Sequence, residues 1–310
     1  MLHRFRAPDL GVHAGHDPQT LRKVLEVLRR RRYPLVSLED VFQRLVAGEA
    51  PPSAGVVFTL DDGYAEQALV AGPIFADYDC PSTTFVTTGF LDGTEWFWWD
   101  RISYVLTHTD RPRVEFVLDG KPVTLECRDT VLRDRAVAGI TEQCKRVSND
   151  EKLAGIARLA AAAGVELPPL PPRGKQPMTW DDLRTAERYG MSFAPHTVTH
   201  PVLSRMTEEA SRFELEESWR RLAEEAARPV KVFCYPNGGF QDFGPRETSC
   251  LASLGFLGAV VGVSGFASRT ATRAERYEVR RFPYPEDPPH FLQYASGVER
   301  LKMIARGIRA

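Results

Sequence analysis

Residues 56–64 read Val-Val-Phe-Thr-Leu-Asp-Asp-Gly-Tyr, a run of β-prone residues that ends in two adjacent carboxylates and a glycine. Such a run predicts a buried strand of a parallel sheet. The carboxyl ends of parallel strands are where α/β folds collect their active-site loops, and a glycine there permits a sharp turn or a close approach to a ligand. Adjacent carboxylates repel each other, so a cation or metal normally holds one of them while the other can act as a base.

Helical and strand patterns alternate on both sides of this run. Apolar residues at 21, 24, 25 and 28 repeat at helical spacing behind the N-cap Asp17 and Pro18. The same reasoning predicts strands at residues 2–5, 34–37, 82–87, 191–194 and 230–235, and helices at about 38–48, 65–77, 179–188 and 207–227. This alternation predicts a parallel α/β architecture.

The alternation stops between residues 90 and 177. Residues 114–118 and 123–127 flank Asp119-Gly120 and predict a β-hairpin, and two alanine- and charge-rich helices follow. Residues 167–174 read Leu-Pro-Pro-Leu-Pro-Pro-Arg-Gly, a stiff linker that cannot be regular structure. We interpret residues 90–177 as an inserted α+β subdomain that closes with a proline-rich linker.

A pair of histidines supplies the imidazole ligands that a metal site at the two carboxylates would need. His196 and His200 lie four residues apart in Phe-Ala-Pro-His-Thr-Val-Thr-His-Pro at 193–201, so both imidazoles face the same side of a helical turn or an extended segment. Two imidazoles and one carboxylate form a ligand set for a divalent metal that leaves positions open for water and substrate. The sequence therefore predicts a metal site of Asp62, His196 and His200. Zinc is the default ion, and cobalt, nickel, iron and manganese are alternatives.

Three motifs together resemble a known family. Thr-Leu-Asp-Asp-Gly at 59–63, His-Thr-Val-Thr-His at 196–200 and Phe-Cys-Tyr-Pro-Asn-Gly at 233–238 look like the leading motifs of the polysaccharide deacetylases, the carbohydrate esterase family 4 enzymes with nodulation-type chitooligosaccharide deacetylase homology. The resemblance implies a distorted, TIM-like (β/α) barrel of seven strands. We expect this barrel to comprise residues 1–89 and 178–290, with residues 90–177 inserted and a C-terminal helix at 291–310.

The resemblance also implies an activity, the metal-dependent hydrolysis of the N-acetyl group of an amino sugar or glycan by a metal-bound water. It implies that Asp61 is the general base and Asp62 a metal ligand. A metal acidifies its bound water, and an adjacent carboxylate can take the proton. The backbone amide of Tyr235 is expected to stabilise the oxyanion, and Pro236 and Asn237 to contact the substrate.

The chain departs from the family pattern at two places. Many family members carry an arginine in the third motif, whereas residues 233–235 read Phe-Cys-Tyr, so no cation is expected there to hold Asp61 ionised. Arg280 and Arg281 are interpreted as a solvated charge pair, although they could point into the barrel.

The late Leu-x-His motif that often supplies the family's general acid is also missing. His290 is the only late histidine and is the candidate acid, with His3 at the end of the first expected strand as the other candidate.

The aromatic run at 96–99, Trp-Phe-Trp-Trp, has two interpretations. Sugars stack on aromatic rings, so Trp98 and Trp99 are candidate substrate contacts, although core packing of the inserted subdomain is the favoured alternative. The basic and apolar residues after Val298 could touch anionic lipid, with a solvated helix face as the favoured alternative.

Composition limits the partners and the location. A formal net charge of −1 and a pI near 6.7 give no general attraction to nucleic acid or anionic lipid. Five cysteines without C-x-x-C spacing predict reduced thiols. The start of the sequence lacks the apolar run of a signal peptide, and no stretch has the length of a membrane span, which predicts a cytoplasmic protein.

Several functions remain open on the sequence alone. A cytoplasmic location favours a soluble nucleotide-linked or lipid-linked sugar, and the same motifs could serve an O-acetyl esterase or a deformylase. A non-haem iron oxygenase uses the same ligand types, but its usual antiparallel scaffold conflicts with the strand–helix alternation. A catalytically inactive glycan-binding protein has no need of Asp61, Asp62, His196 and His200 together.

Overall fold

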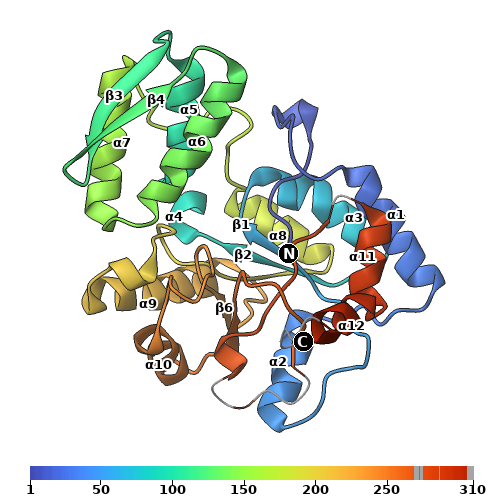
Figure 1. The fold of residues 1–310 in the computed structure, drawn as a ribbon. Helices are drawn as coiled ribbons and strands as arrows, with labels where there is room; N and C mark the ends of the chain where they lie inside the picture. The colour runs from blue at the N-terminus through green and yellow to red at the C-terminus, as the bar shows by residue number, and fades with distance from the viewer. Residues whose placement is uncertain (269–271, 273–274, 286, 306–310) are drawn as a thin grey trace.

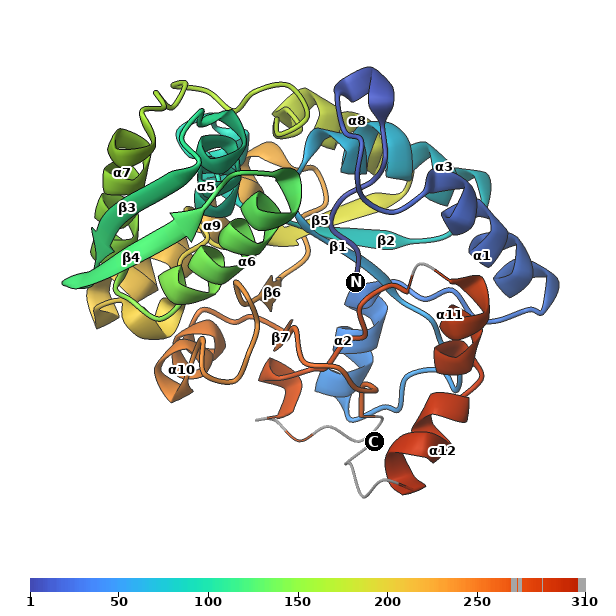
Figure 2. The same cartoon turned by 45° about the horizontal axis from the view of Figure 1, so that its top comes forward.

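A computed structural model describes residues 1–268, 272, 275–285 and 287–305. It shows a larger α/β body and a smaller lobe that is built from the middle of the chain (Figures 1 and 2). The two are joined through the short helix α4 (Thr88–Leu91) and the segment that precedes α8 (Trp180–Arg188).

The larger body contains short strands with helices around them. Its strands are β1 (Phe58–Asp62), β2 (Ser82–Val86), β5 (Met191–Pro195), β6 (Val232–Cys234) and β7 (Gly258–Val260). Its further α-helices are α1 (Pro18–Arg30), α2 (Leu38–Ala47), α3 (Gly72–Asp77), α9 (Glu208–Glu225), α10 (Pro245–Ser253), α11 (Pro288–Ala295) and α12 (Val298–Ala305). Short 3₁₀ or π segments lie at Pro8–Leu10, Gln67–Ala71, Leu203–Arg205 and Glu275–Tyr277.

The strands of the larger body are parallel. β1, β2 and β5 form one sheet in which Asp62 pairs with Val86 and Val86 with Pro195, so the carboxyl ends of the three strands are level. β6 and β7 form a second parallel pair, and contacts between β5 and β6 continue the series. The predicted α/β class is confirmed. The predicted seven-stranded barrel remains a prediction, because the described residues form five regular strands here and otherwise only isolated bridges.

Two expected strands are reduced to such bridges. Residues 2–5 pair only through Leu2 with Leu60 and Phe5 with His16, and residues 34–37 only through Leu35 with Val56. Leu2 pairs with β1 itself, whereas Phe5 and Leu35 pair with residues outside the regular strands. Neither segment forms a continuous ladder.

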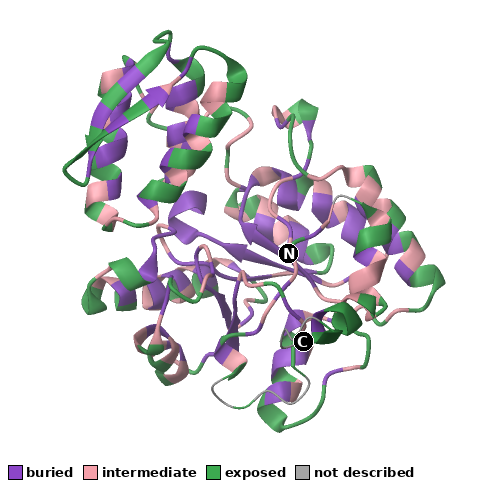
Figure 3. Cartoon of the chain, in the orientation of Figure 1, coloured by how far each residue is buried: buried purple, intermediate pink, exposed green. Residues whose placement is uncertain are grey.

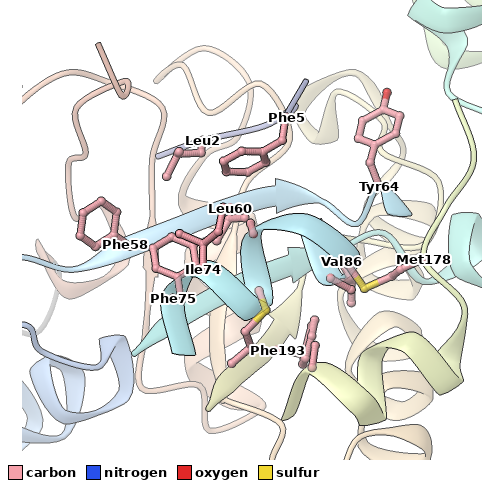
Figure 4. Packing of buried hydrophobic residues seen from close by; sticks show 14 of the residues in the cluster. Leu2, Phe5, Phe58, Leu60, Tyr64, Ile74, Phe75, Val86, Met178 and Phe193 are labelled. Atoms are coloured by element: carbon pink, nitrogen blue, oxygen red, sulfur yellow. The ribbon is translucent and has the colours of Figure 1, made fainter. Parts of the chain in front are cut away.

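The core of the larger body surrounds β1. Figure 4 shows Leu2 and Phe5 packed over this strand, with Phe58 at one end and Tyr64 at the other. Figure 3 shows the strands buried and the outer faces of the surrounding helices exposed. Because each fully buried large apolar side chain contributes about 1.5–3 kcal/mol, this packing fixes the strand that carries the two aspartates.

The smaller lobe has an apolar cluster of its own. It contains α5 (Trp98–His108), the antiparallel strands β3 (Arg113–Leu118) and β4 (Lys121–Glu126), α6 (Thr130–Cys144) and α7 (Asn149–Ala163). The predicted hairpin is confirmed, and both turn residues, Asp119 and Gly120, have positive φ values of 52° and 70°, as a type I′ turn requires.

The expected C-terminal helix at 291–310 is two helices. α11 ends before Gly297, and α12 begins at Val298. Gly297 has a φ of 77°, the left-handed backbone conformation that glycine commonly adopts just after an α-helix. Residues 306–310 lie outside the described part of the chain. Among the described residues, no helix combines the length and apolarity needed to cross a bilayer.

Candidate active site

The predicted chemical groups meet at the carboxyl ends of the strands. β1 ends in Asp61 and Asp62, β5 runs directly into His196, and β6 ends just before Tyr235. Between them lies a cavity of about 200 Å³. Its lining residues are Met1, His3, Asp61, Asp62, Trp99, His196, His200, Tyr235, Asn237, Gly262 and Arg281.

Asp62, His196 and His200 form a compact set of metal-ligand atoms. Oδ1 of Asp62 lies 3.8 Å from Nε2 of His196 and 3.6 Å from Nε2 of His200. Nδ1 of His196 is 2.7 Å from the carbonyl oxygen of Cys234, so it donates the hydrogen and leaves the lone pair on Nε2. The three ligand atoms are near enough to touch one ion.

The electrostatics of this set also fit a cation. Burial lowers the pKa of His196 to about 4 and the pKa of His200 well below its usual value, so both imidazoles are neutral at pH 7. Burial and the neighbouring Asp61 raise the pKa of Asp62 well above its usual range. Within the described ranges, no lysine or arginine forms an ion pair with this buried carboxylate. Two neutral imidazoles and one uncompensated carboxylate suit zinc or a similar divalent ion.

The backbone around the ligands is strained and clamped. Asp62, Thr197 and His200 have positive φ values of 88°, 68° and 54°, a region that costs non-glycine residues about 1–3 kcal/mol each. Glu214 of α9 offsets this cost because its carboxylate accepts hydrogen bonds from the backbone N–H groups of Val198 and Thr199, at 2.7 and 3.0 Å. The loop between the two histidines is thereby held in one conformation.

Arg281 holds the other aspartate. Its two terminal nitrogens donate to Oδ1 and Oδ2 of Asp61 at 2.7 and 2.8 Å, and both side chains are buried. Burial alone would raise the pKa of Asp61, but the Arg281 guanidinium outweighs burial and holds that pKa well below its usual range. The expectation that Arg281 is solvated is therefore wrong, and a cation does hold Asp61 ionised.

Cys234 takes part in the same contact. A terminal nitrogen of Arg281 lies 3.1 Å from its sulfur, and the sulfur lies 3.8 Å from Oδ2 of Asp61. Asp61, His196 and Cys234 thus bring a second set of ligand atoms together. Because Arg281 already occupies Asp61 and Cys234, and burial keeps the pKa of the thiol well above its usual value, this set is a poorer metal site than the one with Asp62.

The two candidate acids lie in different places. Nε2 of His3 is 3.7 Å from Oδ2 of Asp61, and the half-exposed ring lines the cavity. His290 lies exposed on α11 with its ring 4.9 Å from that of Tyr294, and it is not a lining residue. The prediction for His290 is wrong because α11 packs against α1, which leaves this side chain outside the cavity.

The two candidate tryptophans are also separated. The half-buried Trp99 lines the cavity with its ring 4.6 Å from that of His200, and its indole N–H donates to the hydroxyl of Tyr64 at 3.1 Å. Trp98 is buried in the core of the smaller lobe, where the Lys152 ammonium lies 4.9 Å from its ring centre. The prediction that Trp98 contacts substrate is wrong, since consecutive helical residues point in different directions.

Two residues of the third motif, which spans residues 233–238, also line the cavity. Tyr235 and Asn237 both border the cavity, whereas Pro236 is buried and does not. The N–H of Tyr235 donates only a long hydrogen bond, 3.4 Å, to the carbonyl of Val260. The side-chain nitrogen of Asn237 is buried and has no hydrogen-bond partner among the residues that the structure describes. Both N–H groups are therefore available, fully or in part, to a ligand.

The polysaccharide deacetylase profile matches residues 48–244, more than half of the chain. The chain belongs to the polysaccharide deacetylase family. The reaction of this family is the deacetylation of a glycan, and the matched range contains the metal-ligand set and Asp61.

Solved structures share the fold of this family member at low identity. The Streptococcus pyogenes deacetylase PplD in complex with acetate is 18% identical, with a TM-score of 0.59 over 94% of this chain and 95% of that one. IcaB from Ammonifex degensii is 14% identical, with a TM-score of 0.56 over 95% and 94%. The BpsB deacetylase domain from Bordetella bronchiseptica is 13% identical, with a TM-score of 0.54 over 91% and 94%. Among curated proteins, no significant match was found.

The buried Asp61–Arg281 ion pair predicts that the effects of substituting these two residues on the free energy of unfolding are not additive. Arg281→Met leaves a carboxylate buried without its cation, so we expect it to lower the free energy of unfolding by about 3–5 kcal/mol in urea denaturation. The double variant Asp61→Asn/Arg281→Met should lose clearly less than the sum of the two single variants.

Arg280→Met is the matched control for this cycle. Its guanidinium lies 5.5 Å from the exposed Phe240 ring, and we expect a loss below about 1 kcal/mol. Additive losses in the Asp61/Arg281 cycle would contradict the buried ion pair.

Proposed function

We propose that this chain is a metal-dependent hydrolase that removes the N-acetyl group from an amino sugar of a glycan, with Asp61 as general base. The observation that carries the proposal is the juxtaposition at one edge of the sheet. A carboxylate held ionised by Arg281 lies next to a buried set of Asp62, His196 and His200 that needs a cation.

The three ligands would hold a divalent cation, most readily zinc, with cobalt, nickel, iron and manganese as alternatives. Such a cation acidifies water toward neutrality and polarises an acyl carbonyl. The structure supports this assignment through the uncompensated charge of Asp62 and the neutral imidazoles.

Asp61 takes the proton of the attacking water as the water oxygen adds to the carbonyl carbon. Arg281 makes Asp61 a weak base, so the transfer depends on the acidity that the cation gives the water. The same ion pair keeps the carboxylate in one orientation, with Oδ1 and Oδ2 both bound. A fixed, ionised base needs no reorganisation when the reaction occurs.

His3 is the group that gives a proton to the leaving amine. The C–N bond then breaks, and acetate and the free amino sugar are released. The His3 ring lines the cavity beside Asp61. Its pKa is lowered by burial, and Arg281 adds to this, while Asp61 opposes the shift. Because a lowered pKa leaves most of the His3 imidazole neutral at pH 7, His3 acts as the acid from its protonated fraction, and its contribution falls as the pH rises.

Tyr235 and Asn237 of the third motif supply hydrogen-bond donors to the substrate. The N–H of Tyr235 donates only a long hydrogen bond, and the side-chain nitrogen of Asn237 has no partner within the described part of the chain. We assign the first to the developing oxyanion and the second to a polar group of the sugar. Trp99 provides an aromatic surface for an apolar face of the substrate.

The same groups could cleave an O-acetyl ester or a formamide. An amine is a poor leaving group without protonation, whereas an ester needs less help from an acid. The presence of His3 at the cavity therefore favours the amide over the ester. An inactive glycan-binding protein would have no need of the whole set, and the parallel strands argue against an oxygenase.

Two variants separate the base from the metal site. Asp61→Asn should lose at least about 10³-fold in kcat on N-acetylated amino-sugar substrates, because the base is removed, while retaining its metal. His200→Ala should lose both activity and most of the metal, because one of three ligands is gone. Elemental analysis of each purified variant beside a deacetylation assay gives both readouts.

Either of two results would overturn the proposal. If Asp61→Asn keeps near-normal turnover, Asp61 is not the base. If the parent binds neither zinc nor cobalt after incubation, the hydrolytic mechanism fails.

The assignment of the acid is tested by a matched pair of histidine variants. His3→Gln should lower kcat on an amide substrate by about 10²–10⁴-fold with normal metal content, because the amine leaves unprotonated. It should lower the hydrolysis of an activated acetate ester much less, since that leaving group needs no proton. His290→Gln should leave both rates unchanged, and an equal loss in the two variants would remove His3 from the mechanism.

A further inference from the structure

Gln67 is a polar side chain in the core of the larger body, a short way after the end of β1. It is fully buried, and it is the first residue of the π-helical segment Gln67–Ala71. π-helical turns are rare and occur frequently at functional sites. Because a buried amide costs free energy unless its polar atoms are paired, the partners of Gln67 indicate its role.

The side chain of Gln67 bonds to three backbone groups beside the catalytic cavity. Its nitrogen donates to the carbonyl oxygens of His3 and Asp61, and its oxygen accepts a hydrogen bond from the N–H of Gly63 at 3.2 Å. A carbonyl only accepts and an N–H only donates, so these partners also fix which end of the amide is the nitrogen. Both N–H donors of the amide are used.

Two of these contacts hold the peptide groups on either side of Asp62. The carbonyl of Asp61 belongs to the peptide that precedes Asp62, and the N–H of Gly63 belongs to the peptide that follows it. The φ of Asp62 is 88°, a conformation that is costly for a residue other than glycine. Because Gln67 bonds to both peptides, it opposes their rotation about Asp62. The direction in which the Asp62 carboxylate points therefore depends on Gln67.

The third contact joins the first segment of the chain to β1. The N–H of Asp61 donates to the carbonyl of Leu2 at 3.0 Å, within the single bridge between this segment and β1. One residue further along both chains, Gln67 bonds to the carbonyls of His3 and Asp61. A side-chain amide thus takes the place of the next rung of the ladder. It holds His3 beside Asp61, where Nε2 of the ring lies 3.7 Å from the carboxylate.

We propose that Gln67 is a positioning residue of the active site, whose one buried amide both orients Asp62 and holds His3 next to Asp61. Gln67 is not a lining residue of the cavity, so it acts through the backbone of residues that are. The inference rests on the proposed function, from which the roles of these three residues come.

Gln67→Met tests this role, because methionine has a similar length and lacks the amide. We expect the dissociation constant for zinc, measured by competition with a chelator, to rise about 10–100-fold, the range typical of groups that orient metal ligands. We expect kcat on N-acetylated amino sugars to fall by about 10–100-fold, because a small displacement of reacting groups is enough for such a loss. KM should change by less than about threefold, since substrate contacts are kept.

Gln67→Asn is the second variant. It keeps the amide but is one methylene too short to reach all three partners, so zinc affinity and kcat should change in the same direction. It also serves as the test if Gln67→Met does not fold.

Leu28→Ala is the control for loss of stability alone. Leu28 is fully buried in α1 and does not line the cavity, so its truncation destabilises the same core. We expect Leu28→Ala to keep the zinc affinity and kcat of the parent. If Gln67→Met loses only stability, or if Leu28→Ala loses zinc affinity and kcat to the same extent, Gln67 is a structural residue and the proposal is wrong.

Hydrogen exchange separates this inference from the proposed function. If the parent neither binds zinc nor hydrolyses acetylated sugars, the proposed function fails, but the hydrogen bonds of Gln67 can still be tested by mass spectrometry. Peptides that cover residues 2–5 and 58–64 should exchange faster in Gln67→Met than in the parent, and Leu28→Ala should not show this local change. Equal exchange of these peptides in Gln67→Met and the parent would show that Gln67 does not hold the two segments.

Discussion

The active site depends on keeping two carboxylates ionised beside each other in a place with little water. Burial alone would raise the pKa of both Asp61 and Asp62. Arg281 supplies a permanent positive charge to Asp61. Asp62 instead lies beside two neutral imidazoles, in a group that could hold a metal ion. His200, at the end of the clamped histidine loop, and Trp99 border the same cavity as these two carboxylates.

The sequence predicted the groups that lie at strand ends and follow local rules. Asp61, Asp62 and His196 are predictable because they lie at the ends of β-prone runs, and His200 because its spacing of four from His196 places both imidazoles on the same side. The helix starts at Asp17, Ser37, Thr179 and Thr207 were predictable for the same reason, since capping depends on a few neighbouring residues.

Tertiary packing sets the positions of the side chains that the sequence did not predict correctly, which are Arg281, Trp98 and His290. Arg281 looked like one of two surface arginines, and only the pairing of Val279 with Val260 aims it at Asp61. Trp98 and Trp99 are neighbours with the same chemistry, and the helix direction of α5 decides which one reaches the cavity. His3 lines the cavity, whereas His290 lies exposed on α11, which packs against α1. No local sequence pattern encodes this difference.

The Asp61–Arg281 contact joins residues that are 220 positions apart in the chain. During synthesis the strand bearing Asp61 emerges long before its cation. Until the late segment docks, the Asp61 carboxylate either stays in water or takes up a proton, so the buried ion pair is one of the last contacts to form. Contacts of such sequence separation slow folding. The cavity beside Asp61 therefore acquires its final charge distribution only when almost all of the described structure exists.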